Sequence, residues 1–504
     1  MVMKKSFVAF SCVSAAVVLV ILAAMAYFAL SPIVSDTSGP QVSEANQRKS
    51  FMSYRTGISE PQTFEFVDAT ALEGSIDVRT VKATDSDKGG RIVSGYATGE
   101  SSIGDGKVAG KGARVFCAEL TEDGKVQSSW AFELGEKLDF ATAQPHADGT
   151  VSVALTLRGS VRLSDSEFAS AGSTDVLLLW LRKGSLLNEG VDGVLHLRSA
   201  KALTADGICL DEEGGVWLTG TFMEMMSCDG ISLKREGQPS IYALHASGGR
   251  LLTLSGGGSQ GGDKAVGITL DYKGGAWVWG ETCSEGDFGG HPVASDAVKN
   301  VFVARVGWHG KWLSAEVAHP RTGPVDIVGA AVEGNGCCVA FSFEGNARVG
   351  SRSFTSLKGE DVLVLWISEF GDIVDSAQMV SSGTVKLAGM STGPAGGVRL
   401  FGQYSGNLRS DEFALFSKSE DVFVADIGGV RVSDSVPSVQ FSQLCGYGGL
   451  SSDSAHSCWS LGNAGMFAVV SCEGEAPFGR TTLQSGSWLV RMAELTQRNS
   501  SHKW

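Results

Sequence analysis

Residues 270–281 read LDYKGGAWVWGE, and residues 210–221 read LDEEGGVWLTGT. The two stretches share an aspartate, two glycines, a tryptophan and a third glycine at matching positions. A short aspartate side chain can bond the backbone amides of a tight turn, and glycine adopts the positive φ that other residues resist. The tryptophan brings a large apolar area to the strand that follows the turn. Each stretch therefore predicts a hairpin with a glycine turn.

This hairpin recurs along the whole chain. Alignment on its second glycine places the same slot at Gly90, Gly149, Gly215, Gly275, Gly336, Gly397 and Gly465. A second, apolar signature begins at Arg114, Asp175, Ser240, Asn300, Asp361, Asp421 and Ser487. Both marks return about every sixty residues, which is typical of a repeat fold built from small units. We number these units repeat 1 to repeat 7 in chain order.

Repeat 5 indicates how each unit divides into strands. Apolar runs at 326–333, 336–343 and 362–367 predict three strands, and the tight turn at 369–372 leads into a fourth. A polar connection separates the second strand from the third. Because a single four-stranded sheet cannot bury both of its faces, neighbouring units must stack. The sequence therefore predicts an all-β chain folded as a seven-bladed β-propeller with four antiparallel strands in each blade.

The two ends of the repeat region predict how the ring closes. Six units end with a fourth strand, whereas the seventh stops after SWLVRMAEL at residues 487–495. The segment TFEFVDATAL at residues 63–72 precedes repeat 1 and has no unit of its own. We expect it to supply the missing outer strand of the last blade, so that the propeller spans residues 61–495.

Repeat 4 carries the clearest resemblance to a known family. Its pieces LDYKGGAWVWG, GDFGGHPV, NVFVARV and GKWL resemble the bacterial seven-bladed β-propeller repeat proteins, called SBBP repeats. The resemblance covers residues 60–495 and is weakest in repeat 2, which lacks the glycine pair, and in repeat 7, where an alanine replaces the first glycine. It implies a propeller in an exported bacterial setting. The family has no common activity and no common catalytic residues, so the resemblance implies neither for this chain.

The N-terminus has a different character. Lys4 and Lys5 precede a run without charge from residue 6 to residue 34. A spanning helix needs about 20 apolar residues, whereas the apolar core of a cleavable signal has roughly 7–15. The length predicts a transmembrane signal anchor over residues 6–30, and the positive-inside rule makes residues 1–5 a cytoplasmic stub.

The remaining segments follow from this anchor. Residues 31–60 are polar without a clear period and predict a flexible linker, and residues 496–504 form a C-terminal tail. The expected location is the cytoplasmic membrane, crossed once, with the propeller in the periplasm. The alternative is a cleaved signal, because Ala-Met-Ala at residues 24–26 fits a small-x-small site and would be cut near Ala26.

Composition restricts the classes of binding partner and of cysteine site that the chain can have. A net charge of −14 argues against a nucleic-acid footprint, which needs clustered lysine and arginine. Nine of the ten cysteines lie beyond the apolar run, and no C-x-x-C pair indicates a zinc ribbon or a thioredoxin-type motif. Cys445, Cys458 and Cys472 are the expected place for one disulfide, with buried thiols as the alternative.

Motifs that could carry chemistry have simpler explanations. GGGSQGG at residues 256–262 fits both G-x-S-x-G and G-x-G-x-x-G, but both motifs need a helix after the turn, and a strand pattern follows here. DSDKGG at residues 85–90 lacks the third acid and the final glutamate of a calcium loop. We expect a crossover and a turn at these places. The eight histidines form no H-x-x-x-H pair, so no catalytic residue, cofactor or metal ligand is assigned.

The expected function is a membrane-tethered, non-catalytic interaction scaffold. The long connections at 98–113, 223–239 and 344–360 should gather on one face, and several carry basic residues despite the acidic whole. An envelope protein or a glycan is the expected partner on this face. Membrane contact is expected through the N-terminal helix only.

The alternative function is a polysaccharide-acting hydrolase or lyase with a site in the propeller funnel. Such an enzyme needs acids, bases or a metal that converge near the axis. The candidates on or beside the inner strands are Asp206, Asp211, Asp263 and Asp271.

Overall fold

The computed structural model describes residues 64–494, with internal gaps. The gaps are 109, 111, 164, 183–190, 236–237, 295–298, 333–335, 357, 394–396, 411–412, 429–439, 449–450, 461–465 and 479–480. The chain divides into two compact units, Met1–Met52 and Ser53–Trp504, and every described residue belongs to the second. The predicted stub, anchor, linker, C-terminal tail and cleavage site lie outside the described residues. Among the residues that are described, no helix has the length and apolar character to cross a bilayer.

The described residues form an all-β fold of antiparallel sheets, as the repeat predicts. Repeat 4 shows the plan, with β18 (Asp263–Leu270), β19 (Ala276–Thr282), β22 (Asn300–Val306) and β23 (Trp312–Pro320) paired in chain order. The corresponding strands are β6 (Leu138–Pro145), β7 (Val151–Leu157), β10 (Asp175–Leu181) and β11 (Val191–Ser199) in repeat 2, and β12 (Gly207–Leu210), β13 (Val216–Phe222), β16 (Ser240–Ser247) and β17 (Arg250–Ser259) in repeat 3.

Repeats 5 and 6 follow the same order. Their strands are β24 (Pro324–Val332), β25 (Gly336–Phe343), β28 (Asp361–Ile367) and β29 (Ile373–Ser381), then β30 (Val385–Thr392), β31 (Val398–Arg409), β32 (Ala414–Gly428) and β33 (Gln440–Tyr447). The three strands expected from apolar runs in repeat 5 are therefore confirmed, as is the weaker fourth.

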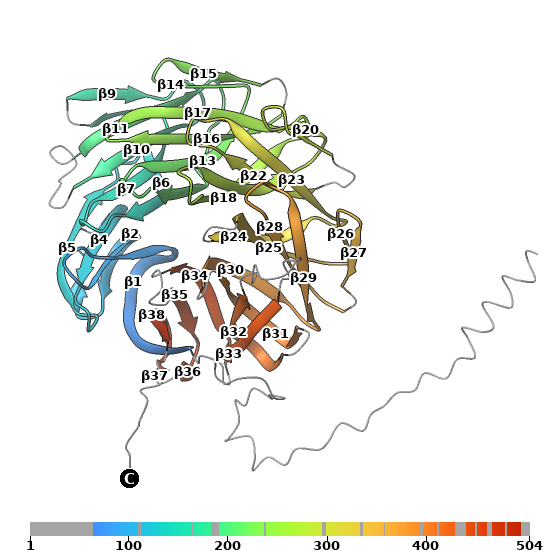
Figure 1. Cartoon of the computed structure of the whole chain (residues 1–504). Helices are drawn as coiled ribbons and strands as arrows, with labels where there is room; N and C mark the ends of the chain where they lie inside the picture. The colour runs from blue at the N-terminus through green and yellow to red at the C-terminus, as the bar shows by residue number, and fades with distance from the viewer. Residues whose placement is uncertain are drawn as a thin grey trace, which may run out of the picture. The chain divides into compact units, whose positions relative to one another are not determined.

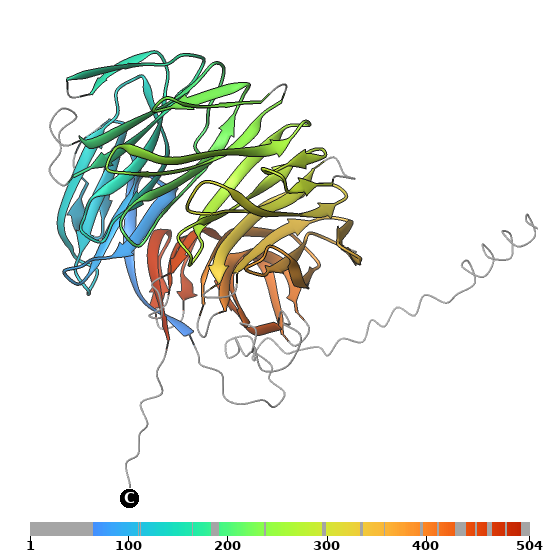
Figure 2. The ribbon, with the colours of Figure 1, turned by 45° about the horizontal axis from the view of Figure 1, so that its top comes forward.

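The first and last repeats share one long strand, β1 (Phe64–Asp85). Repeat 1 adds β2 (Arg91–Ile103), β4 (Arg114–Leu120) and β5 (Val126–Glu133), and repeat 7 adds β34 (Asp453–Ser460), β35 (Met466–Cys472) and β38 (Gly486–Glu494). The N-terminal part of β1 pairs with β38, with Phe64 opposite Glu494 and Leu72 opposite Ser487. Its C-terminal part pairs with β2 after register shifts near Gly74 and Asp77. The expected pairing of residues 63–72 with SWLVRMAEL is present, and Figures 1 and 2 show β1 beside β38.

The first strands of the repeats contact one another in sequence. β6 contacts β12, β12 contacts β18, β18 contacts β24, β24 contacts β30, and β30 contacts β34. β1 contacts both β34 and β6, so each of these strands has two first-strand neighbours. Figure 1 shows β18, β24, β30 and β34 toward the middle of the ribbon, with the later strands of each repeat farther out.

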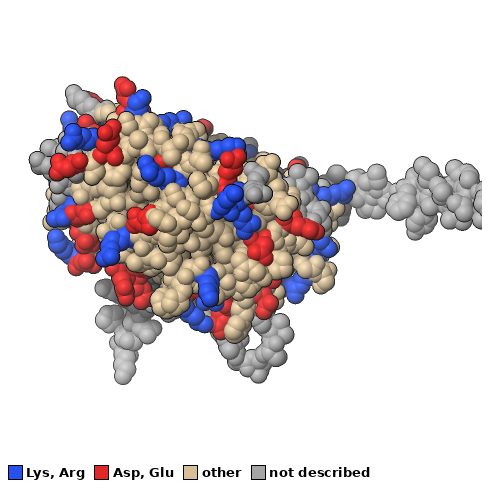
Figure 3. Space-filling model, turned by 90° about the horizontal axis from the view of Figure 1, so that it is seen from above, with Lys and Arg blue, Asp and Glu red and all other residues tan. Residues whose placement is uncertain are grey.

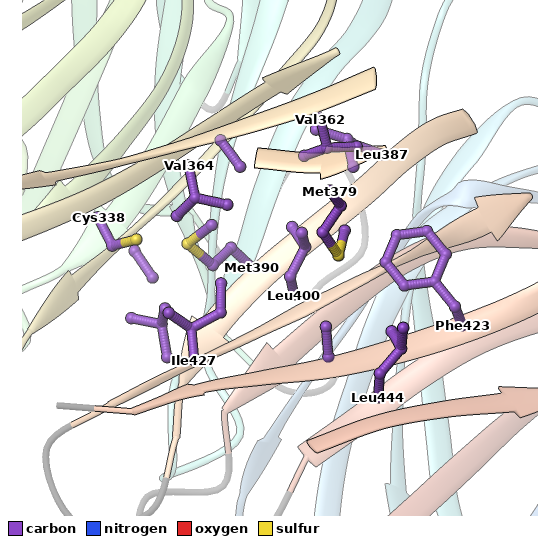
Figure 4. Close-up of a cluster of buried hydrophobic side chains, with 14 of the residues drawn as sticks. Cys338, Val362, Val364, Met379, Leu387, Met390, Leu400, Phe423, Ile427 and Leu444 are labelled. Atoms are coloured by element: carbon purple, nitrogen blue, oxygen red, sulfur yellow. The ribbon is translucent and has the colours of Figure 1, made fainter. Parts of the chain in front are cut away.

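The hydrophobic core lies between adjacent sheets. Figure 4 shows one cluster, in which Cys338, Val362 and Val364 of repeat 5 face Met390 and Leu400 of repeat 6. All of these side chains are buried. Nine cysteines of the described chain carry free thiols, so the bridge expected among Cys445, Cys458 and Cys472 is not formed. Cys458 and Cys472 are buried thiols, as in the alternative, whereas Cys445 is only partly buried. Packing between layers, rather than cross-linking, therefore holds the sheets together.

The connection between second and third strands is a paired hairpin in most repeats, and not the polar loop expected from sequence. The short strands are β3 (Gly106–Lys107), β8 (Ser160–Leu163), β9 (Ser166–Ala169), β14 (Met225–Cys228), β15 (Ile231–Lys234), β20 (Gly286–Asp287), β21 (Pro292–Val293), β26 (Asn346–Val349), β27 (Arg352–Thr355), β36 (Ala476–Phe478) and β37 (Thr481–Leu483). β14, β20 and β26 pair with the last strand of the preceding repeat, which is β11, β17 and β23 respectively. Gly230 and Gly350 allow two of these turns at φ values of 81° and 56°.

Candidate functional site

The four acids expected in a funnel each have partners of their own. Asp211 accepts hydrogen bonds from the backbone amides of Glu213 (2.9 Å) and Gly215 (2.6 Å), and its carboxylate lies 2.7 Å from His245 Nε2. Asp271 occupies the same slot in repeat 4 and binds Arg305 Nε at 2.6 Å. These two aspartates therefore cap the hairpin turns, as the repeat sequence predicts.

The other two acids are bonded locally. Asp263 accepts a hydrogen bond from Ser259 Oγ at 2.6 Å, and Asp206 accepts one from Thr204 Oγ1 at 2.7 Å. Burial raises the pKa of both carboxyls. Within the described chain no hydrogen bond joins any two of the four candidate acids, and no group of three acidic, histidine or cysteine side chains is placed to hold a metal.

The two glycine-rich motifs are structural. Residues 256–259 lie in β17, and strand β18 follows instead of a helix. Ser259 is buried, with its hydroxyl held by Asp263, so it is not placed as a nucleophile. In DSDKGG, both glycines have positive φ and Ser86 N donates to Gly90 O at 3.2 Å, which makes this stretch the expected turn.

One titratable pair in the interior was not predicted. Lys82 of β1 and Cys209 of β12 come from different repeats and lie within electrostatic reach of each other. Burial lowers the pKa of Lys82 to about 8, and burial raises the pKa of the Cys209 thiol to about 12 although Lys82 opposes that shift. Sequence reasoning missed this pair because nothing in a single strand shows which residue of another repeat lies beside it.

Three of the exposed aromatic side chains lie on turns of repeats 4 and 5. Tyr272 lies in the turn between β18 and β19, Trp308 follows β22, and Phe370 lies between β28 and β29. Their exposed fractions are 48%, 58% and 76%. A methyl group built on Gly274 would lie 3.8 Å from Trp308 Cβ, so two of these turns adjoin. We call Tyr272, Trp308 and Phe370 the turn patch.

A buried frame holds the turn patch in place. The guanidinium of Arg305 binds Asp271 and also donates to the backbone carbonyl oxygen of Glu369, while Lys273 pairs with the Glu369 carboxylate. Arg305 also lies over the Trp277 ring, 5.5 Å from its centroid. The turn of repeat 4 is thereby tied to the turn of repeat 5. Such ties reduce the entropy that exposed side chains lose when they bind.

Repeat 3 contains the same frame. Its Asp211, His245 and Trp217 take the places of the aspartate, the arginine and the tryptophan, sixty positions earlier in each case. The His245 ring stacks on Trp217 with centroids 4.5 Å apart. Repeats 3 and 4 therefore share an arrangement in which an aspartate bonds a nitrogen-bearing side chain that lies over a tryptophan ring.

The exposed aromatic residues are not part of this arrangement. Repeat 3 has Glu212 where repeat 4 has Tyr272, and Gly248 where repeat 4 has Trp308. In repeat 3 the contacts among the aspartate, the histidine and the tryptophan thus form without aromatic residues at these two turns, so they do not require Tyr272 or Trp308. Sequence comparison between repeats could have found these two residues, because an aromatic residue replaces a polar residue or a glycine at a turn.

Charges around the molecule are mixed. Figure 3 shows lysine and arginine interspersed with aspartate and glutamate over the face that is seen from above. No single-sign field dominates this view, in agreement with the sequence argument against a nucleic-acid surface.

Comparison with known proteins identifies no family for this chain. No family model and no curated protein matches the chain. Among solved structures, the chain is similar to a GH43_12 protein retrieved from a capybara gut metagenome. The identity is 8%, the match covers 86% of this chain and 100% of that one, and the TM-score is 0.19. A likeness of this size carries no argument about activity.

Proposed function

We propose that this chain is a membrane-tethered, extracytoplasmic β-propeller of the SBBP type that works as a non-catalytic scaffold and docks a protein partner on the turn patch. In this proposal seven blades form a ring that β1 closes. The cycle of contacts between first strands and the pairing of β1 with β38 support the ring. The charge-free run at residues 6–34 supports the tether.

The turn patch is the observation on which the docking proposal rests. Burying one large apolar side chain stabilises a structure by about 1.5–3 kcal/mol, so leaving three aromatic residues exposed on turns forgoes stability. Tryptophan and tyrosine are enriched among the residues that dominate protein–protein binding. Because repeat 3 forms the corresponding aspartate–histidine–tryptophan contacts without aromatic residues at two of these turns, we assign the turn patch to binding.

The composition of the patch favours a protein over a glycan. Glycan recognition needs polar groups directed at sugar hydroxyls, whereas Lys273, Glu369 and Arg305 are engaged with one another. An aromatic centre bordered by an ion pair matches the core and rim of a protein interface. The connections at 98–113, 223–239 and 344–360 remain a predicted face, although much of their backbone is paired into neighbouring sheets.

Photo-crosslinking of the full chain in its native envelope tests the proposal. We expect benzoylphenylalanine at position 370 to give a discrete polypeptide adduct, and the same group at position 416 to give none, since Phe416 is 62% exposed outside the patch. The adduct identified in this way is then purified and titrated against the chain. Trp308→Ala should weaken binding roughly 30-fold, as expected for a central anchor of about 2 kcal/mol.

Two results would overturn the proposal. Equal adducts at positions 370 and 416 would show that the patch has no specific occupant. Trp308-dependent retention on a purified polysaccharide, without a polypeptide adduct, would assign the patch to a glycan instead. A converging set of acids in the interior would be needed for the polysaccharide-acting alternative, and the four candidates do not form one.

A further inference from the structure

The aspartate that begins the third strand has the same task in repeats 2 and 5. Asp175 of β10 accepts hydrogen bonds from Ser199 N at 2.9 Å and from His196 Nε2 at 2.9 Å. Asp361 of β28 accepts them from Ser381 N at 2.8 Å and from Gln378 Nε2 at 2.5 Å. In both repeats the carboxylate caps the end of the fourth strand, and one side chain of that strand supplies a donor.

Repeat 6 breaks this pattern. Asp421 of β32 is the corresponding aspartate of repeat 6. In repeats 2 and 5 the donors His196 and Gln378 lie opposite the second residue after the aspartate. In repeat 6 that residue is Phe423, and the residue opposite it is Gly446. The fourth strand therefore supplies no side-chain donor, although Ser417 still hydrogen-bonds to the Asp421 carboxylate. Asp421 is 3% exposed, and its Oδ1 has no hydrogen-bond partner. A buried carboxylate oxygen without a partner is costly, so this place calls for another ligand.

A second carboxylate arrives at the same place from repeat 7. Asp453 begins β34 and is 1% exposed. A methyl group built on Gly448 would lie 2.3 Å from Asp421 Oδ1 and 2.7 Å from Asp453 Oδ2. These two oxygens are therefore at most 5.0 Å apart, the sum of the two distances. A side chain at position 448 would therefore clash with both carboxylates.

This meeting of two acids is particular to one junction. After Ser240, Asn300 and Asp361 the next first strand begins with Asp263, Pro324 and Val385 respectively. After Asp175 the corresponding residue is Leu203, which forms an isolated bridge with Phe222 ahead of β12. Only between repeats 6 and 7, among these five described junctions, do both positions hold aspartate. At the junction between repeats 3 and 4 the second position is Asp263, and its carboxylate accepts a hydrogen bond from Ser259 Oγ. The pair is thus not a requirement of the repeat.

We propose that Asp421 and Asp453 bind one divalent cation of the calcium class across the junction between repeats 6 and 7. Ca²⁺ accepts carboxylate oxygens at 2.3–2.6 Å, so one ion can reach two oxygens that lie no more than 5.0 Å apart. The ion supplies the positive charge that Asp421 lacks. It also joins the last two repeats of the chain directly.

The surroundings favour a hard cation. The nearby thiol of Cys472 is buried and hydrogen-bonded to Asp453, and burial is the main reason why its pKa is raised to about 12. Carboxylate oxygens are the ligands that Ca²⁺ prefers, so a pair of aspartates favours a hard cation. Burial is the main reason why the pKa of Asp421 is raised to about 6; the charge of Asp453 adds to this shift, whereas the hydrogen bond with Ser417 opposes it.

Equilibrium dialysis of the full chain in detergent against labelled Ca²⁺ tests this site, after removal of bound ions with a chelator. Because only two carboxylates contribute, we expect one ion per chain with a dissociation constant on the order of 10⁻⁴ to 10⁻³ M. Asp421→Asn should weaken binding at least tenfold. Gly448→Ala should do the same, because it places a methyl group beside both carboxylates.

The matched control is Asp361→Asn. It changes the same slot of repeat 5, where the next strand begins with Val385, and it should leave Ca²⁺ binding unchanged. Cooperative thermal unfolding of each variant checks that it is folded. No binding at 10 mM Ca²⁺, equal binding by Asp421→Asn and the unaltered chain, or a preference for Zn²⁺ over Ca²⁺ would each overturn the proposal.

Discussion

Substitution of Phe66 by alanine tests whether β1 is part of the core. Phe66 is fully buried on β1, and its ring meets Tyr447 and Phe478 edge-on with centroids 4.8 and 5.5 Å away. Truncating a buried phenylalanine costs about 3–5 kcal/mol, because apolar contact is lost and a cavity remains. Each aromatic pair contributes about 0.5–1.5 kcal/mol of this loss. We expect Phe66→Ala to destabilise repeats 6 and 7 together with the N-terminal strand.

Thermal unfolding of the full chain, followed by tryptophan fluorescence, measures the effect. A unit of this size has an unfolding entropy on the order of 1 kcal/mol per degree, so Tm should fall by about 3–5 °C. The control is Phe416→Ala, which removes the same side chain from a position that is 62% exposed and should change the stability by less than about 0.5 kcal/mol. Equal shifts for the two variants would refute the reasoning, because β1 would then contribute no core contact.

Two further predictions concern buried charge. Arg305→Met removes the cation beside the buried Asp271 carboxylate and should lower the free energy of urea unfolding by about 3–5 kcal/mol. The control Arg79→Met, at a side chain that is 76% exposed, should lower it by less than about 1 kcal/mol. Similar losses for both variants would contradict a structural role of the Arg305–Asp271 pair. Burial lowers the pKa of Lys82 from 10.5 to about 8, so the folded chain releases this proton first. Stability should therefore rise by about 1 kcal/mol between pH 7 and pH 9, and Lys82→Met should abolish that rise. A rise that persists in the variant would assign it to other groups.

The sequence predicts the repeated architecture because its signals are local. Asp211 and Asp271 cap turns as their spacing to the glycines suggests, and the apolar runs of repeat 5 become strands. The segment before repeat 1 pairs with β38 because it is the one unassigned strand pattern next to a repeat with a strand missing. Period and chain order are enough for these conclusions.

What the sequence does not reveal depends on register between strands. The hairpins between second and third strands were taken for loops, because each of their strands is only two to four residues long. That Gly446 stands where His196 and Gln378 stand in other repeats appears only once the strands are aligned. The meeting of Asp421 with Asp453 then follows from packing between two sheets. Such contacts leave no periodic trace in the chain.

The pairing of β1 with β38 has a consequence for biosynthesis. Phe64 finds its partner in Glu494, 430 positions later. At about 5–20 residues per second, a ribosome takes about 20–90 s to cover that distance. Throughout this interval the earliest strand to be made has one bare edge, and a contact this far apart in the chain also forms slowly. This pairing must therefore wait until β38 has been made, and a helper that shields β1 during synthesis would act on this edge.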